Sequence, residues 1–304
     1  MTLIPVPSTG VSPAVNGSGR TPAHPALDDA THRLLRERSL RVREHVLRTA
    51  AGGGSFVGAA LSCVDLLVYL YTCFLRVDPA DPDAPDRDYL FLSKGHAVPA
   101  LYGVLAEIGL LAPQRLRRHL HTDDVIYWHP NPQVPGVEFY SGSLGHLLPV
   151  AVGVALDCRL AGNPNRVVVM VGDGELNEGS NWEALLVAAA YRLDNLTVVV
   201  DRNGFQANLP TEALIPLEPL EAKFRAFGCE TARVSGHDFA ALAFTFHRLP
   251  LRGGAPSVVI ADTVRGRGVP SLEARADRWF VKAKPDEIES WLRELRQTNQ
   301  IGER

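Results

Sequence analysis

The sequence has little cysteine and no excess of charge of one sign. Its four cysteines, Cys63, Cys73, Cys158 and Cys229, are far apart and form no CxxC pair, which argues against a zinc site or a disulfide framework. The 31 basic and 34 acidic residues give a formal net charge of -3, so no basic surface for nucleic acid or an anionic membrane is indicated. We therefore expect reduced thiols and a cytoplasmic protein without nucleic-acid or membrane partners.

Long apolar segments are also missing. The longest uncharged apolar stretch, about 142–156, is too short to span a bilayer, and no basic region followed by an apolar run marks a signal peptide. Fourteen of the first 25 residues are Pro, Ser, Gly or Thr, so residues 1–25 are predicted to be a disordered tail. Residues 26–304 are then the folded domain.

Beyond residue 160, short runs of β-branched residues alternate with helical segments. This alternation predicts an α/β fold, doubly wound, with a mostly parallel sheet and helices on both faces. The expected strands are 89–92, 166–171, 196–200, 231–234 and 257–260. The expected helices are 28–50, 62–74, 99–111, 113–121, 145–159, 181–192, a region around Lys223, 239–249 and 285–298, with a loop over 123–139.

Polar residues follow two of these strands where each one ends. Gly172-Asp173-Gly174 comes after 166–171, and Asn203 comes after the next strand along the chain. In open parallel sheets, ligands bind beyond the carboxyl ends of the strands. A carboxylate with an amide oxygen suits Mg²⁺, and the two glycines let the backbone approach a phosphate closely. The pattern therefore predicts a site for Mg²⁺ and a diphosphate.

The wider wording around these residues resembles that of transketolases, in particular their separately encoded N-terminal subunits. The resemblance covers 172–184 and 200–206, and further matches follow in order from about residue 30 to 295, at 92–96, 129–138, 142–146, 236–238 and 263–269. It implies thiamine diphosphate and Mg²⁺ as cofactors, and the diphosphate-binding domain of the thiamin-diphosphate-binding fold.

The resemblance assigns five residues to the metal and the diphosphate. Asp173 and Asn203 would bind the metal, with the backbone carbonyl of Phe205 as the third protein ligand. Gly172 and Gly174 would lie against the diphosphate, and Asn203 would thus also contribute to cofactor binding.

The resemblance also assigns residues to the reacting centre. His96 would lie near both the diphosphate and the reacting atoms, and His129 would face the substrate. Gly142 and Leu144 would pack on the aminopyrimidine ring of the cofactor. Glu178 would lie at a subunit interface and couple two active sites.

Other polar residues near these motifs have ordinary structural interpretations. Glu175 is expected to be a turn or cap residue, and Asp201 to make local hydrogen bonds rather than bind metal. His237 is interpreted as a turn residue. For Arg265, contact with a phosphate and a place in a solvated loop are both open.

Two positions depart from the family pattern. Phe56 and Phe280 stand where the family usually carries histidines that line the catalytic cleft. Because phenyl rings cannot hydrogen-bond a sugar hydroxyl, these substrate-shaping residues predict a less hydroxylated donor, such as pyruvate or another short 2-oxo acid, or else an unusual ketose.

The chain matches only the diphosphate-binding half of a single-chain transketolase. In the family, the glutamate that activates the cofactor lies on the other half. The expected partner is therefore a separate C-terminal, pyrimidine-binding transketolase subunit, in an α2β2 complex that acts on small-molecule substrates. The expected reaction transfers a two-carbon unit from a ketose or 2-oxo donor to an acceptor carbonyl. The alternatives are a carboligase that decarboxylates a 2-oxo acid and transfers the acyl group, and a non-catalytic regulatory homologue.

Overall fold

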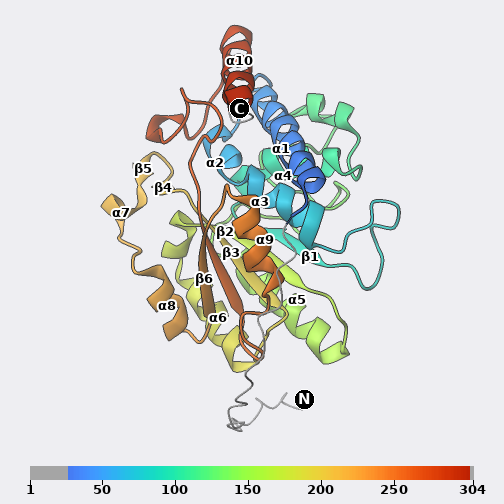
Figure 1. Cartoon of the computed structure of the whole chain (residues 1–304), viewed down its shortest axis with the longest axis vertical. Coiled ribbons are helices and arrows are strands. Elements are labelled where there is room, and N and C mark those ends of the chain that lie inside the picture. Colours follow the sequence, from blue (N-terminus) through green and yellow to red (C-terminus); the bar gives the residue numbers. More distant parts are fainter. Residues whose placement is uncertain (1–26, 302–304) are drawn as a thin grey trace.

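The computed structural model describes residues 27–301, so the predicted tail at 1–25 lies outside the described residues. A five-stranded sheet forms the centre of the molecule, and all of its neighbouring strands are parallel (Figure 1). Its strand order is β1 (Tyr89–Leu92), β2 (Val167–Gly172), β3 (Leu196–Arg202), β7 (Ser257–Asp262) and β6 (Glu230–Ser235). The expected parallel sheet is thereby confirmed, and each predicted strand is present to within two residues at either end.

The register brings the carboxyl ends of the strands to one edge. Gly172 pairs with Asp201, and Arg202 pairs with Asp262 on the next strand. The β2 run Val-Val-Val-Met-Val is buried throughout, as expected for a central strand covered on both faces. The turns after β2 and β3 therefore emerge side by side, which the sequence pattern predicted.

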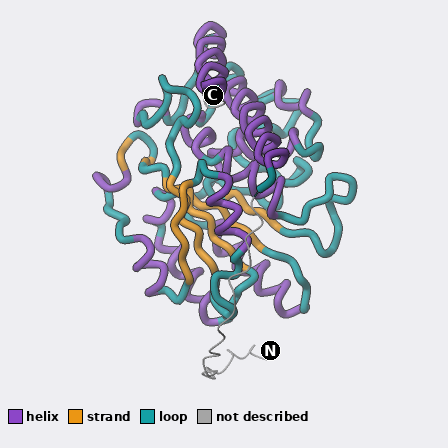
Figure 2. The backbone as a smooth tube through the Cα atoms, in the orientation of Figure 1, coloured by secondary structure: helices purple, strands orange, loops and turns teal. Residues whose placement is uncertain are grey.

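Helices cover both faces of the sheet (Figure 2). Alternate strand residues divide the core in two: Val168, Met170 and Val199 pack with one group of helices, and Val169, Val171 and Val198 pack with the other. The first group comprises α1 (Asp29–Thr49), α2 (Val57–Ser62), α3 (Val64–Tyr69), α4 (Val98–Glu107), α9 (Phe239–His247) and α10 (Pro285–Ile301). The second comprises α5 (Leu147–Ala161), α6 (Gly179–Ala190) and α8 (Leu220–Ala226).

One predicted helix is divided in the structure. The segment expected as a single helix over 62–74 consists of α2, which already begins at Val57, then α3, and a π-helical turn at Leu70–Phe74. The break falls at Cys63, whose backbone lies outside the helical region, at φ -99° and ψ 7°. The segment expected as a helix over 113–121 is a 3₁₀ helix that ends at Arg118.

The loop predicted at 123–139 contains no helix or strand and is held at both ends by bidentate ion pairs. Arg115 donates to Asp124 at 3.2 and 2.6 Å, and Arg87 donates to Glu138 at 2.5 and 2.9 Å. Bidentate pairs of this kind fix direction as well as position. The two ion pairs therefore fix the ends of the loop that carries His129.

A small antiparallel hairpin follows β3. It consists of β4 (Phe205–Gln206) and β5 (Leu209–Pro210), and it continues into the short helix α7 (Thr211–Leu214). The hairpin lies at the carboxyl edge of the main sheet, at the left of Figure 1. It therefore borders the site predicted from the sequence.

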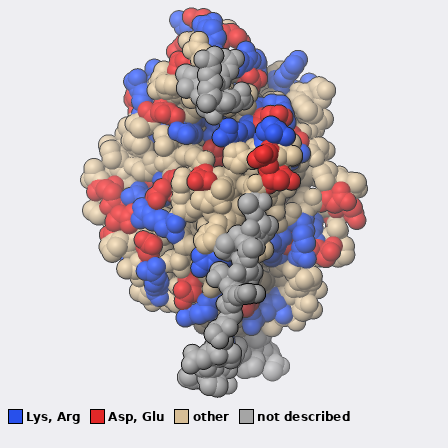
Figure 3. Space-filling model, viewed as in Figure 1, with Lys and Arg blue, Asp and Glu red and all other residues tan. Residues whose placement is uncertain are grey.

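Within residues 27–301, no helix combines the length and the apolar character needed to cross a membrane. On the face drawn in Figure 3, basic and acidic side chains are interspersed among uncharged ones. This mixture matches the small net charge of the sequence.

Candidate active site

Asp173 is the buried carboxylate at the end of β2. Its side chain is 1% exposed and accepts hydrogen bonds from the backbone amides of Gly174 (2.8 Å) and Gly204 (2.7 Å) and from the Arg202 guanidinium (2.8 Å). Burial raises the pKa of this carboxyl, and the Arg202 bond opposes that shift. The carboxylate thus lies where the β2 and β3 turns meet, with cation and amide partners around it.

Asn203 lies in the turn after β3, on the same sheet edge. Its Oδ1 accepts the backbone amide of Phe205 at 3.0 Å, and its Nδ2 donates to Asp201 at 3.0 Å. These two bonds orient the amide so that its oxygen faces the hairpin that begins at Phe205. The described residues contain no group of three or more His, Cys, Asp or Glu side chains that could hold a metal. Any cation here would rely on the carboxylate, the amide and backbone oxygens.

The glycine turn after β2 is packed closely. A Cβ atom at Gly174 would lie 2.7 Å from Cβ of Gln206, so only glycine fits between this turn and the hairpin. At Gly172 the nearest atom to an added Cβ, the Lys94 Cβ, is 3.6 Å away, which is an ordinary contact. Close approach of the chain is therefore required at Gly174 and not at Gly172.

Asp201 forms a buried ion pair with Lys94. Both side chains are at most 1% exposed, and Asp201 also accepts hydrogen bonds from Ser62 (2.7 Å) and Thr263 (2.5 Å). Burial alone would raise the pKa of Asp201, but the Lys94 ammonium lowers it below its usual value. These contacts agree with the expectation that Asp201 makes local hydrogen bonds. They tie the end of β1 to the end of β3.

Glu175 does more than end a turn. It is 2% exposed and accepts hydrogen bonds from the backbone amides of Gly145 (2.9 Å) and Gly172 (3.1 Å) and from the Ser93 hydroxyl. Burial raises the pKa of this carboxyl. The expectation of a turn or cap residue was thus too narrow, because Glu175 joins three segments that are distant in sequence.

His96 and His129 lie near the same phenyl ring. The ring of Phe56 is 5.6 Å from the His96 ring and 6.2 Å from the His129 ring, between centroids. Burial, with Lys94 nearby, lowers the pKa of His96 to about 3, and burial also lowers that of His129. Both imidazoles are therefore neutral near pH 7, each able to donate one proton and accept another.

The turn at 141–145 packs against His129 and against Gly95, the residue before His96. Gly142 has φ +139°, and a Cβ there would lie 2.6 Å from the His129 ring. A Cβ at Gly145 would lie 2.5 Å from Cβ of Glu178, so the exposed Glu178 packs against this turn. Leu144 is partly buried in the same turn. The fold thus brings together five residues that the sequence motifs singled out in separate parts of the chain: His96, His129, Gly142, Leu144 and Glu178.

Phe56 and Phe280 are in contact, as part of an aromatic cluster. Their ring centroids are 5.1 Å apart, and Trp279 is equally close to Phe56. Trp128 extends the cluster at 6.1 Å from Phe280, and its indole donates to the Gly54 carbonyl at 2.9 Å. Phe280 and Trp128 are 41% and 39% exposed, so the outer side of the cluster faces solvent.

Arg265 is buried, which decides the question that its sequence motif left open. The side chain is 2% exposed and donates from Nη1 to the Ala207 carbonyl at 2.6 Å. Its Nε and Nη2 have no hydrogen-bond partner among residues 27–301. Its guanidinium lies 5.3 Å from the Phe205 ring, and burial lowers its pKa to about 10, so it is charged near pH 7. A buried cation with two unpartnered donors suits an anionic ligand.

His237 also has a different environment from the one expected. It was interpreted as a turn residue, and it does lie in the turn after β6, but its side chain is only 10% exposed. Nδ1 lies 2.8 Å from Asp65, and Nε2 accepts the backbone amide of Val264 at 2.8 Å. Both ring nitrogens are therefore committed to the interior.

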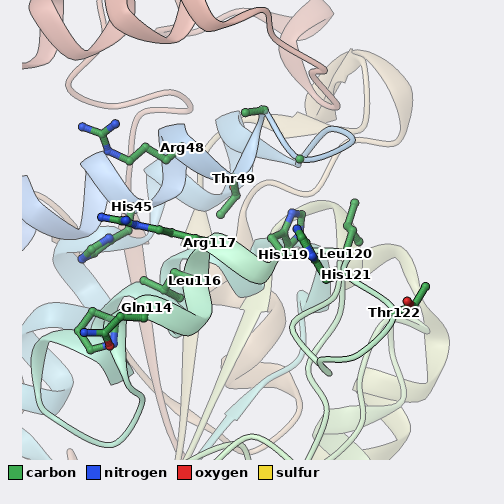
Figure 4. Close-up of a pocket in the computed structure, with 13 residues that line it drawn as sticks. His45, Arg48, Thr49, Gln114, Leu116, Arg117, His119, Leu120, His121 and Thr122 are labelled. Carbon is green, nitrogen blue, oxygen red and sulfur yellow. The ribbon is translucent and has the colours of Figure 1, made fainter.

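A cavity of about 780 Å³ lies away from these residues (Figure 4). It is bordered by the end of α1, the glycine turn that follows and the segment 113–122, and none of the predicted site residues lines it. The predicted residues instead face the carboxyl edge of the sheet.

Comparison with known proteins agrees with this geometry. Residues 39–297 match the family described as transketolase, thiamine diphosphate binding domain. The chain is 39% identical over 260 residues to one subunit of the apulose-4-phosphate transketolase of Actinobacillus succinogenes, covering 85% of this chain and 94% of the relative. It is 35% identical over 224 residues to the 6-deoxy-6-sulfo-D-fructose transketolase subunit SqwG of a Clostridium species, covering 73% and 82%.

Solved structures show the same fold. Transketolase from Campylobacter jejuni superimposes with a TM-score of 0.78 at 26% identity, over 88% of this chain and 43% of that protein. The chain therefore spans less than half the length of the solved transketolase that it matches, but nearly the whole length of the subunit from Actinobacillus succinogenes. The chain belongs to the transketolase family, and it corresponds to the family's thiamine diphosphate binding domain.

Proposed function

We propose that this chain is the cofactor-binding subunit of a two-component transketolase that transfers a two-carbon ketol unit to an acceptor carbonyl. The proposal rests on the position of Asp173, Asn203 and the buried Arg265 at one edge of the sheet. All three lie next to the turn and hairpin that follow β3: Asp173 accepts the Gly204 amide, Asn203 accepts the Phe205 amide, and Arg265 lies against the Phe205 ring. The relatives whose names designate transketolase subunits support ketol transfer over the decarboxylating carboligase and the regulatory homologue.

The residues present fit a magnesium diphosphate. The Asp173 carboxylate, the Asn203 amide oxygen and the Phe205 carbonyl are hard oxygen ligands of the kind that Mg²⁺ takes, with its other positions left to phosphate and water. The free Nε and Nη2 of Arg265 suit the diphosphate oxygens. The Gly174 turn, with Gly172 before it, lets the backbone lie close to the same anion. When bound, thiamine diphosphate supplies the carbon chemistry of donor cleavage.

We assign His96 and His129 to the side of the site that faces the substrate. As neutral imidazoles they can hold or pass a proton at a donor or acceptor oxygen. Gly142 and Leu144 form the surface next to them on which we place the aminopyrimidine ring. We place the aromatic cluster of Phe56, Phe280, Trp279 and Trp128 along one side of this space.

The donor that we propose is a ketose with fewer hydroxyl groups facing the cluster than ordinary ketose phosphates have. Phe56 and Phe280 offer no hydrogen-bond partner to a hydroxyl, so a buried hydroxyl opposite them would stay unpaired. Of the donors expected from the sequence, the relatives' names favour an unusual ketose over a 2-oxo acid, because they specify apulose 4-phosphate and 6-deoxy-6-sulfo-D-fructose.

The partner that we propose is a separate C-terminal, pyrimidine-binding subunit, in an α2β2 complex. Leu186 and Val187 on α6 are 56% and 43% exposed, and Leu160 on α5 is 58% exposed. At Gly153 and Gly179, on the outer sides of the same helices, an added Cβ would meet nothing within 4 Å. An open apolar face of this kind is typical of an interface. Glu178 precedes α6 beside this face, which supports its place at a subunit contact.

Four free cysteines, three of them buried, are consistent with a reducing compartment, and we propose the cytoplasm.

The function is tested by adding the purified partner to this chain with thiamine diphosphate and Mg²⁺, then measuring two-carbon transfer from a ketose phosphate to an aldehyde. We expect activity that depends on both subunits and on Mg²⁺. Absence of cofactor binding by the complex would contradict the proposal, and binding with donor decarboxylation alone would favour the carboligase.

A further inference from the structure

The loop 263–268 after β7 carries Arg265 and is held by hydrogen bonds with residues from three other parts of the chain. The Val264 amide donates to Nε2 of His237 at 2.8 Å, and the Gly266 amide donates to the Gly58 carbonyl at 3.0 Å. Nε of Arg43 donates to the Arg267 carbonyl at 3.1 Å. These bonds alternate along the loop on either side of Arg265, so they define where its side chain begins.

The tautomer of His237 follows from its two partners. Because Nε2 accepts the Val264 amide, the ring proton lies on Nδ1, which donates to Asp65 at 2.8 Å. Asp65 is 6% exposed and also accepts a bidentate pair from Arg43, at 2.9 and 2.7 Å. Burial would raise the pKa of Asp65, but Arg43 and His237 hold it well below its usual value. The Asp65 carboxylate therefore holds the His237 imidazole in the tautomer whose Nε2 can accept the Val264 amide.

The contacts from Asp65 through His237 to the loop lead to Arg265, whose side chain has two hydrogen-bond donors without a partner among the described residues. Within the described part of the chain, the Arg265 side chain makes one hydrogen bond, to the Ala207 carbonyl, and its Nε and Nη2 are buried without a partner. Placing a Cβ at Gly58 would bring it 3.0 Å from the Arg265 Nε, so the guanidinium is confined on the side of α2. A guanidinium held this way needs no reorganisation to bind an anion, provided that the loop stays in place.

We propose that His237 is a positioning residue for the cofactor site: with Asp65 behind it, its bond to the Val264 amide holds the loop so that Arg265 presents its free donors to a diphosphate. The inference rests on the proposed function, which places the diphosphate beside Arg265. It assigns to His237 a role in anion affinity, beyond a contribution to folding.

The test uses the full chain, with inorganic pyrophosphate and MgCl₂ as the probe. Pyrophosphate corresponds to the diphosphate part of the cofactor, which the proposed function places on this chain and not on the pyrimidine-binding partner. Titration calorimetry on Arg265→Ala should show affinity lowered by about 10- to 100-fold, the loss of a charge-assisted bond. His237→Ala should lower it about tenfold. His237→Gln can accept the Val264 amide and donate to Asp65, so it should recover most of the loss.

A double-mutant cycle separates positioning from general destabilisation. In the Arg265→Ala background, His237→Ala should cause no further loss of affinity, because the residue being positioned is gone. Hydrogen exchange at the 263–268 segment should rise in His237→Ala and stay near the original rate in His237→Gln. The exposed His121 offers a matched control, and His121→Ala should change neither quantity.

Two results would overturn the inference while leaving the proposed function intact. One is a His237→Ala chain that melts at lower temperature but binds pyrophosphate as tightly as the original. The other is full additivity with Arg265→Ala. If the original chain binds neither magnesium pyrophosphate nor, with its partner, thiamine diphosphate, the proposed function fails and the inference fails with it.

Discussion

The rings of Phe56 and Phe280 lie 5.1 Å apart at an angle of 68°, an edge-to-face contact between the start of α2 and the segment before α10. Gly54 makes this contact possible, because a Cβ there would lie 2.5 Å from Cζ of Phe280. Edge-to-face pairs at this separation are favourable beyond the area they bury. The two positions expected from the sequence to depart from the family pattern are thus in direct contact.

Replacing these rings with histidine should widen the range of donors. In the reconstituted complex, we expect Phe56→His and Phe280→His each to raise the specificity constant for xylulose 5-phosphate about tenfold, since each restores one partner for a buried hydroxyl. The measurement compares xylulose 5-phosphate and pyruvate with one shared aldehyde acceptor. Phe244→His, at an exposed position of α9, is the control. A specificity constant for xylulose 5-phosphate that neither histidine variant raises would refute the role given to the rings.

Removing the proposed metal ligands should remove magnesium-dependent cofactor binding. Asp173→Ala should abolish it, because no other charged ligand is proposed, and Asn203→Ala should weaken it by about 10- to 100-fold. Titration of thiamine diphosphate at limiting Mg²⁺ checks both. Asp262→Ala is a matched control, because Asp262 also ends a strand at this edge but pairs with Arg233. Unchanged affinity in both site variants would move the metal elsewhere.

Breaking the buried pair of Lys94 and Asp201 should destabilise the fold strongly. Lys94→Met leaves Asp201 buried without its cation, which typically costs about 3–5 kcal/mol of unfolding free energy. Urea unfolding at pH 7 measures this. Arg275→Met, which breaks the exposed pair with Asp277, should have a much smaller effect.

The same pair gives a defined pH dependence. The folded pKa of Asp201 lies below its usual value, so its contribution is present above about pH 4 and lost as the pH falls through the folded pKa. The folded pKa of Lys94 is raised despite burial, so its contribution is lost only as the pH rises beyond about 10.5. The stability difference between the original chain and Lys94→Met should therefore be constant near neutrality and shrink in acid. A difference that grows on acidification would contradict this assignment.

The chain should be inactive without its partner. We expect an apolar interface of more than about 2,000 Å², as obligate complexes have. Leu186→Glu on the exposed side of α6 should prevent assembly, as checked by size-exclusion chromatography, while leaving the melting temperature of the isolated chain nearly unchanged. Glu221→Leu on α8 is a control at another helix surface. Turnover by the highly purified chain alone would defeat the two-component proposal.

The sequence by itself determined the parallel sheet and the edge of the sheet at which Asp173 and Asn203 lie. Buried runs such as 167–171 have no polar side for solvent, so they predict central strands, and consecutive strands of this type end at one edge. The positions of Asp173 and Asn203 follow from that local logic, because each lies within three residues of its strand's end.

Only the tertiary structure decided the surroundings of Glu175, His237 and Arg265. Glu175 receives hydrogen bonds from Ser93 and Gly145, and His237 contacts Asp65, all partners that are remote in sequence. A residue's burial and charge partners depend on which segments pack against it, and short-range patterns carry no information on that. The same reason explains Arg265, for which the motif left open contact with a phosphate and a place in a solvated loop. Packing against α2 and the hairpin buries its side chain, which excludes the solvated loop.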